Sequence, residues 1–268
     1  MSEKRPYVLS IAGFDPCGGA GITADIKTFE ANKVYGLGVC SALTFQNDEN
    51  FEGVDWIPFE KIIKQIEMLN KKFKIDWIKI GLIESFEVLE KLVLYLEEIF
   101  KDCKIIWDPI LKASAGFSFH QDIEVNRLEI FARNLFLITP NWDEIQKLYR
   151  GMDSLEGAKR LSRYCNVFLK GGHNTKAPGR DYLFLIDLVD ASVKNRLETK
   201  NNGKMNQFSF RPKEIIKYHK HGSGCVLSAA IAANLARGWS LNRACLRSKD
   251  YITKFLSSSE GLLGFHKI

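Results

Sequence analysis

The sequence lacks several features that would assign it to a specialised class. None of its six cysteines forms a Cys-x-x-Cys pair, and no cysteine–histidine cluster has zinc-site spacing, so we expect reduced thiols. No apolar run approaches the roughly 18 residues that span a membrane, and the run after Pro6 is too short for a signal peptide. These absences predict a cytoplasmic protein that does not enter a membrane.

Long blocks of like charge are also missing. The 38 basic and 32 acidic residues give a net charge of +6, but no five like charges stand together. This scatter argues against a nucleic-acid groove and suits an anionic small-molecule substrate. A solvated surface accounts for most of the lysines.

What the sequence does contain is a regular alternation of strand-length apolar runs and helical patterns over 268 residues. It predicts an α/β fold, a doubly wound and mostly parallel sheet with helices on both faces, in a single domain of residues 1–268. Residues Asp181–Phe210 break the pattern and predict antiparallel strands around an exposed polar excursion, Lys194–Asn206. The expected strands are Tyr7–Ala12, Gly38–Phe45, Trp77–Ile80, Lys104–Trp107, Leu135–Ile138 and Asn166–Leu169, and the expected helices are Ala20–Ala31, Phe59–Lys72, Ser85–Phe100, Trp142–Leu148, Leu155–Tyr164, Cys225–Ala236 and Leu241–Leu256.

Polar residues and glycines gather where the expected strands end. Ligands of open α/β sheets bind outside the carboxyl ends of the strands, so this rim is the expected site. The residues are Gly13-Phe14-Asp15, Gln46-Asn47, Gly81, Asp108, Thr139-Pro140-Asn141 and Lys170-Gly171-Gly172-His173.

The strongest single signal is the turn His221-Gly222-Ser223-Gly224-Cys225, which leads into an alanine-rich helix. Free N–H groups at such a start form an anion site, and the helix field is expected to lower the pKa of the Cys225 thiol. Phosphoryl transfer needs both features, donors for phosphate charge and a titratable group beside the attacking hydroxyl. An ordinary helix start with a serine cap and an inert buried cysteine is the alternative.

Three weaker signals lie elsewhere on the rim. The glycine-rich stretch from Gly13 to Gly21 opens a helix but is not a Walker A loop, and Asp25 either faces the rim or lies in solvent near the helix start. Asn141 and Glu144 share one side of a first helical turn, as magnesium ligands or as a capping box. Lys170 neutralises phosphate charge or simply ends a strand at the surface.

Together these segments resemble the ribokinase superfamily and, within it, the hydroxymethylpyrimidine/phosphomethylpyrimidine kinases of thiamine biosynthesis. The resemblance runs from about Tyr7 to about Leu256. It is carried by Ser10 to Phe29, Ala42-Leu43-Thr44-Phe45-Gln46-Asn47, Lys79-Ile80-Gly81-Leu82, Trp107-Asp108-Pro109-Ile110, Thr139-Pro140-Asn141, Lys170-Gly171-Gly172-His173 and His221-Gly222-Ser223-Gly224-Cys225.

The resemblance implies ATP-dependent phosphorylation of 4-amino-5-hydroxymethyl-2-methylpyrimidine and then of its monophosphate, with Mg²⁺, in a homodimer. It places Gly222, Ser223, Gly224 and Cys225 at the transferred phosphoryl group. The remaining implied residues are Gly13, Asp25, Gln46 and Leu82 for the pyrimidine, Asp108, Asn141, Lys170 and Lys220 for the nucleotide, and Glu144 with Asp108 for the metal.

This chain departs from the family pattern in several places. Cys17 stands where the family usually has serine, and Leu82 where it usually has methionine. The family's Lys-Ser-Gly after Asp108-Pro109 is absent, which leaves Lys112 as a substitute phosphate contact. Two alternatives remain open: a pyridoxal or pyridoxine kinase, and a non-catalytic pyrimidine-binding regulator on the same fold.

Overall fold

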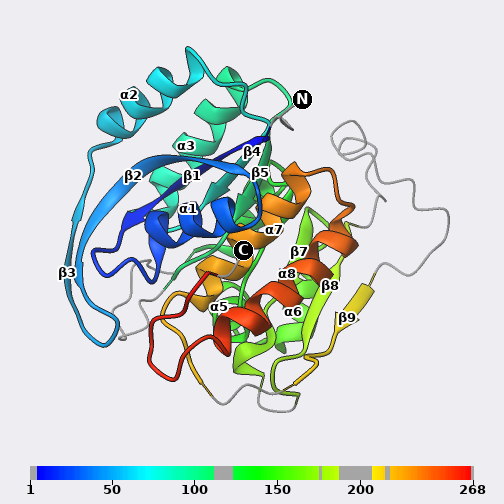
Figure 1. Ribbon diagram of the computed structural model, residues 1–268. Helices are drawn as coiled ribbons and strands as arrows, with labels where there is room; N and C mark the ends of the chain where they lie inside the picture. Colours follow the sequence, from blue (N-terminus) through cyan, green and yellow to red (C-terminus); the bar gives the residue numbers. More distant parts are fainter. Residues whose placement is uncertain (1–4, 112–122, 175–176, 187–206, 215–217, 267–268) are drawn as a thin grey trace.

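The structure is a computed structural model that describes residues 5–111, 123–174, 177–186, 207–214 and 218–266 (Figure 1). The stretch that contains Lys112 and the excursion Lys194–Asn206 lie outside the described residues, so the predictions made for them stay predictions.

A nine-stranded sheet carries the fold, in the order β3-β2-β1-β4-β5-β6-β7-β8-β9. Neighbouring strands from β2 to β7 run parallel, whereas β3 at one edge and β8 and β9 at the other pair antiparallel. The strands are β1 (Tyr7–Phe14), β2 (Tyr35–Gln46), β3 (Phe51–Trp56), β4 (Trp77–Ile80), β5 (Lys104–Trp107), β6 (Leu137–Ile138), β7 (Asn166–Leu169), β8 (Asp181–Phe184) and β9 (Gln207–Phe210).

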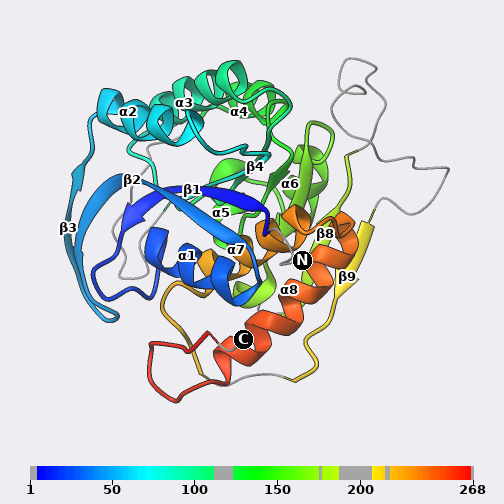
Figure 2. The same ribbon diagram turned by 45° about the horizontal axis from the view of Figure 1, so that its top comes forward.

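Eight α-helices of the described residues cover both faces of this sheet (Figures 1 and 2). One apolar core lies under α2 to α6 and the other under α1, α7 and α8. The doubly wound, mostly parallel architecture predicted from the sequence is confirmed. The helices are α1 (Gly21–Ala31), α2 (Phe59–Asn70), α3 (Phe86–Ile99), α4 (Val125–Ala132), α5 (Trp142–Leu148), α6 (Ser154–Leu161), α7 (Ser223–Ala236) and α8 (Leu241–Leu256), with a short 3₁₀ turn at Gly171–His173.

Helix α7 differs from the other helices in being apolar around its whole circumference. It packs against α1, α8 and strands β1 and β4, and eleven of its residues are buried. A helix of this kind belongs in a core. Its N-terminus is therefore fixed rigidly at the carboxyl edge of the sheet.

Successive side chains of strand β4 point to opposite faces of the sheet. Ile78 and Ile80 point into the core under α2 and α3, while Lys79 points to the opposite face. Ser10 is the β1 partner of Lys79 in the parallel ladder, so both polar side chains lie under α1 and α7.

Two elements are absent from the sequence prediction. Strand β3 pairs antiparallel to β2 at the sheet edge, and its residues are half-buried or exposed, so it lacks the apolar run that marks a buried strand. Helix α4 has eight residues and no side-chain cap. No helix of the described residues is both long and apolar enough to cross a membrane.

Candidate active site

A cavity of about 740 Å³ lies at the carboxyl edge of the parallel strands, along the predicted rim. It reaches from the ends of β1 and β2, past the N-terminus of α7, to the loops after β6 and β7. Of the predicted site residues, those that line it are Gly13, Gln46, Leu82, Asp108, Asn141, Glu144, Lys170, Lys220, Gly222, Ser223, Gly224 and Cys225.

The start of α7 is a turn without a side-chain cap. Gly222 precedes the helix with φ 69°, in the left-handed region, and no side chain caps the first turn. The uncapped first turn of a 14-residue helix presents N–H donors and the positive end of the helix dipole. The uncapped helix start predicted from the sequence therefore lies at the cavity wall, and anion binding there stays a prediction.

A second glycine loop packs directly against this turn. A Cβ on Gly222 would lie 2.1 Å from the carbonyl oxygen of Gly19, and one on Gly21 would lie 2.1 Å from the carbonyl oxygen of Gly13. Both glycines also have positive φ, so a side chain at either position is disfavoured by the backbone conformation as well as by the collision. The loop between β1 and α1 thus abuts the anion turn.

Cys225 lines the cavity with 7% of its surface exposed. Burial raises the pKa of its thiol to about 11; the Lys79 ammonium opposes this rise, while Asp108 and Asp25 add to it. The predicted lowering of this pKa is wrong, because the loss of hydration outweighs the field of the helix and of Lys79. The thiol is neutral at physiological pH.

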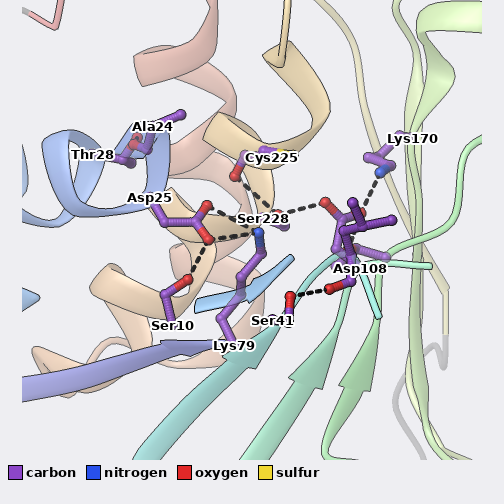
Figure 3. A network of polar contacts seen from close by, with 12 residues as sticks. Ser10, Ala24, Asp25, Thr28, Ser41, Lys79, Asp108, Lys170, Cys225 and Ser228 are labelled. Atoms are coloured by element: carbon purple, nitrogen blue, oxygen red, sulfur yellow. Dashed lines mark hydrogen bonds and ion pairs between the residues drawn. The ribbon is translucent and has the colours of Figure 1, made fainter. Parts of the chain in front are cut away.

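Lys170 and Asp108 form an ion pair beside the anion turn (Figure 3). The Lys170 Nζ lies 2.6 Å from Asp108 Oδ1 and 3.8 Å from Glu144 Oε2. Burial disfavours the ammonium, but these two carboxylates outweigh it and raise the pKa of Lys170. A Cβ on Gly224 would lie 3.4 Å from this ammonium, so its positive charge adjoins the first turn of α7.

Asp108 is held by two hydroxyl groups as well. Thr139 donates to its Oδ1 at 3.1 Å, and Ser228, on α7, donates to its Oδ2 at 3.0 Å. These contacts fix the carboxylate at the end of β5, where it lines the cavity. The sequence predicted its place on the rim, but not its partner on α7.

The capping-box interpretation of Asn141 and Glu144 is confirmed, and the magnesium interpretation stays a prediction. The Asn141 side chain accepts the Glu144 N–H at 2.8 Å, and Glu144 Oε2 accepts the Asn141 N–H at 2.6 Å, which is a complete capping box. The same Glu144 side chain lines the cavity near Lys170. Glu144 and Asp108 thus supply two carboxylates to one wall, the oxygen donor set that Mg²⁺ favours.

The opposite end of the cavity is less charged. Gly13, Gln46 and Leu82 line it together with Thr44 and Phe51, which the sequence did not single out. A Cβ on Gly13 would lie 3.0 Å from Leu82 Cδ2, so the glycine leaves room for the Leu82 side chain beside β1. An apolar wall with one amide group suits a small planar heterocycle.

Asp25 does not take the place predicted for it. Its carboxylate is fully buried and lies outside the cavity lining; it accepts two hydrogen bonds from Lys79 Nζ, at 2.8 and 2.9 Å, and one from Ser10 Oγ at 2.6 Å (Figure 3). The pairing holds the pKa of Lys79 above its ordinary value despite burial. The prediction missed this because Lys79 lies 54 residues away in the sequence.

Lys220 lines the cavity, but its ammonium is already occupied. It donates to the backbone carbonyls of Ser259 and Gly261 and is 5% exposed. The ammonium therefore ties down the C-terminal segment, and the predicted contact with nucleotide phosphates stays a prediction.

Several cavity residues were not predicted from the sequence. His221 opens the predicted turn but was given no role of its own. Asp181, the first residue of β8, and Lys249, on α8, form an ion pair of 2.7 Å. No spacing or motif links Asp181 to Lys249.

Several known proteins of similar sequence or structure are named as kinases. The profile of the phosphomethylpyrimidine kinase family matches residues 15–266. The chain is 32% identical over 266 residues to a hydroxymethylpyrimidine/phosphomethylpyrimidine kinase of Saccharomyces cerevisiae, covering 94% of this chain and 46% of that protein. It is also 32% identical to the enzyme of that name from Aquifex aeolicus, covering 95% of each chain.

The chain spans about half the length of the first curated relatives that it matches. Among solved structures, an ADP complex of Bacillus subtilis pyridoxal kinase superposes with a TM-score of 0.76 at 25% identity, covering 97% of this chain and 94% of that one.

Proposed function

Because the chain belongs to the phosphomethylpyrimidine kinase family, we propose that it phosphorylates 4-amino-5-hydroxymethyl-2-methylpyrimidine with ATP, and then the resulting monophosphate, in thiamine biosynthesis. The observation that carries the proposal is one cavity with two unlike ends. A weakly polar end holds Gln46 and Leu82, and a charged end holds Lys170 and the N-terminus of α7.

The pyrimidine would lie against Gly13 and Leu82, with the Gln46 amide at its aminopyrimidine edge. An amide offers both a donor and an acceptor, which matches the paired donor and acceptor of that edge. Its hydroxymethyl group then extends toward Cys225, which lines the same cavity.

The phosphates of ATP would bind at the other end. The uncapped N–H groups of the first turn of α7 hold the transferred phosphoryl group, and Lys170 neutralises part of its charge. Phosphoryl transfer depends mainly on such positioning and charge stabilisation.

Mg²⁺ fits the same wall. Glu144 and Asp108 would hold it, because both carboxylates line the cavity and both lie near Lys170. When bound, the ion offsets charge on the phosphate oxygens. Asn141 orients Glu144 through the capping box, and Thr139 and Ser228 orient Asp108.

Cys225 would act as a neutral thiol beside the attacking hydroxyl. The pKa of about 11 leaves roughly one thiol in ten thousand ionised at pH 7. The hydroxyl proton would pass to an oxygen of the transferred phosphoryl group. A hydrogen bond from the thiol to the attacking oxygen needs no ionisation, so we favour charge stabilisation over proton abstraction by Cys225.

Product analysis by mass spectrometry tests the proposal. The folded protein is incubated with ATP, Mg²⁺ and the free pyrimidine, and we expect the monophosphate followed by the diphosphate. Calorimetric binding of the pyrimidine without ADP release in a coupled assay would instead identify a non-catalytic binding protein.

Pyridoxal kinase activity is the second candidate, favoured by the likeness to the pyridoxal kinase of known structure. The two activities share the fold and differ in the shape of the apolar end of the cavity. We expect kcat/KM to be higher for the pyrimidine than for pyridoxine, and the reverse order would exchange the two assignments.

We also propose that the enzyme is a cytoplasmic homodimer made of single-domain protomers. Six free cysteines suit a reducing compartment. Phe14, Leu43 and Phe45 are 42–50% exposed at the ends of β1 and β2, and a second copy would cover them. Light scattering on the purified chain measures its molar mass in solution and so tests the homodimer.

A further inference from the structure

A cluster of three metal-binding residue types lies next to the anion turn, and the reaction proposed above does not use it. Asp15 and Cys17 come from the loop between β1 and α1, and His221 immediately precedes Gly222. One ligand atom from each lies within 4.8 Å of the other two. The His221 Nε2 is 3.0 Å from Asp15 Oδ2, and the Cys17 Sγ is 3.2 Å from the same oxygen.

The carboxylate at the centre of the cluster is held in place by the backbone. Asp15 is 1% exposed; its Oδ1 accepts the N–H of Cys17 at 3.0 Å, and its Oδ2 accepts those of Gly19 and Ala20 at 3.1 and 2.8 Å. Burial opposes ionisation, but the hydrogen bonds from His221, Cys17 and Ala20 outweigh it and lower the pKa of Asp15. The carboxylate is therefore charged and oriented before any ligand arrives.

We propose that Asp15, Cys17 and His221 form a binding site for a thiophilic divalent cation of the Zn²⁺ class. Cysteine sulfur, imidazole nitrogen and carboxylate oxygen are the ligands of protein-bound zinc, and three protein ligands leave the fourth position for water. Mg²⁺ selects oxygen ligands, so this site is distinct from the carboxylate pair Asp108 and Glu144.

Two of the three distances between ligand atoms are close to those that a tetrahedral ion requires, and the third, between Cys17 and His221, is within 4.8 Å. Zinc bonds of about 2.0–2.3 Å at tetrahedral angles place neighbouring ligand atoms roughly 3.3–3.6 Å apart. The two contacts to Asp15 Oδ2 are 3.0 and 3.2 Å, so the ligands need to separate by a few tenths of an ångström. Cys17 is partly exposed, which gives an ion a route to the cluster.

Binding the ion requires proton displacement. Burial, together with Asp15, raises the pKa of the Cys17 thiol to about 11, so the ion releases the thiol proton to solvent as the metal–sulfur bond forms. The neutral imidazole must then carry its proton on Nδ1, which is buried without a hydrogen-bond partner among the described residues. This unsatisfied donor makes the site weaker than a four-ligand structural zinc site.

The ion would join two loops that already touch. Gly19, two residues after Cys17, abuts Gly222, one residue after His221. The proposal concerns metal binding alone and does not depend on phosphoryl transfer, so its test uses no activity measurement.

The test uses the full chain, stripped of metal and free of any affinity tag, with Cys17→Ser as the variant. Cys40→Ser is the matched control, because Cys40 is also a partly exposed free cysteine but belongs to no metal-binding group of the described residues. Titration calorimetry with Zn²⁺ should give one equivalent for the wild type and for Cys40→Ser. We expect Cys17→Ser to weaken this binding by ~10-fold or more.

Cobalt(II) supplies the spectroscopic check. The wild type and Cys40→Ser should show a thiolate-to-cobalt charge-transfer band that Cys17→Ser lacks, and excess Mg²⁺ should leave it unchanged. Thermal melting confirms that each variant is folded. Equal Zn²⁺ binding by the wild type and Cys17→Ser, or a cobalt–thiolate band that survives in Cys17→Ser, would overturn the proposal.

Discussion

At the scale of single residues, a buried charge pair lies beneath α1 and α7. Lys79 and Asp25 are fully buried, and Ser10 completes the hydrogen bonding of the carboxylate. Such a pair contributes little net stability by itself, but loss of one partner leaves the other charge uncompensated in the core. The pair therefore makes the site sensitive to single substitutions far from any ligand.

We predict that Lys79→Met lowers the free energy of unfolding by about 3–5 kcal/mol, because it isolates the Asp25 carboxylate. The double variant Lys79→Met/Asp25→Leu removes both charges and should recover most of this loss. Urea unfolding of the wild type, the single variant and the double variant measures these free energies. A double variant no more stable than the single one would contradict the argument.

Cys225 gives a prediction of pH dependence. Below its pKa of about 11 the thiol is protonated, and the thiolate fraction grows tenfold for each pH unit between 7 and 9. A thiolate base would make kcat/KM rise in the same proportion. We expect no such rise from Cys225, because the neutral thiol is the working form.

The same argument ranks two substitutions. Cys225→Ser keeps a hydrogen-bond donor and should stay within tenfold of wild type. Cys225→Ala removes it, which costs about 1.5–3 kcal/mol, or roughly 10- to 100-fold in kcat. Steady-state kinetics from pH 7 to 9 tests both expectations. If kcat/KM of the wild type rises tenfold per pH unit and this rise is absent from both variants, Cys225 acts as the base.

At the scale of elements, the turn before α7 depends on one glycine. Gly222 has φ 69°, and a Cβ there would meet the carbonyl oxygen of Gly19 at 2.1 Å. Gly238, after the same helix, has φ 84° but no heavy atom within 4 Å of the Cβ position. Both glycines have positive φ, but a Cβ would collide with a neighbouring atom only at Gly222.

We predict that Gly238→Ala costs about 1–2 kcal/mol of stability through backbone conformation and leaves kcat/KM nearly unchanged. Gly222→Ala should cost more and lower kcat/KM at least tenfold, because the collision displaces the anion turn. Thermal melting and kinetics on both variants provide the comparison. Equal kinetics in the two variants would show that the contact with Gly19 does not position the turn.

The sequence located most elements because their patterns are local. The bounds of β4, β5, β7, α5 and α8 match their predicted ranges, since buried apolar runs mark the strands, a capping box marks α5 and an amphipathic pattern marks α8. Strand β3 escaped notice because an edge strand with Glu52 and Asp55 carries no buried run. Its pairing to β2 is a tertiary property that short patterns do not encode.

The same limit explains which site residues could be predicted from the sequence. Gln46, Asp108 and Lys170 were placed correctly because strand ends fix them on one rim. Asp25 was placed wrongly, because its partner Lys79 lies in β4. Lys220 lines the cavity as predicted, but its partners, the carbonyls of Ser259 and Gly261, were not foreseen. Position along the chain predicts the edge of the sheet, but not which polar group is already satisfied.

At the scale of the whole molecule, the apolar ends of β1 and β2 predict how copies associate. Phe14 and Leu43 are partners in the parallel ladder, and Phe45 follows on the same face of β2. We predict that Phe45→Glu shifts the dimer toward monomer in light scattering. Leu94→Glu, at another exposed apolar side chain on α3, is the control that should leave the assembly intact. An unchanged mass for Phe45→Glu would place the interface elsewhere.

The contact between Gly19 and Gly222 has a thermodynamic consequence. In the proposed reaction one loop would flank the pyrimidine and the other would hold phosphate, and the contact means that a shift of one loop is expected to move the other. Any factor by which the nucleotide tightens pyrimidine affinity must equal the factor by which the pyrimidine tightens nucleotide affinity. We therefore expect occupancy at one end to change affinity at the other, and reciprocal titrations to return one shared cooperativity constant.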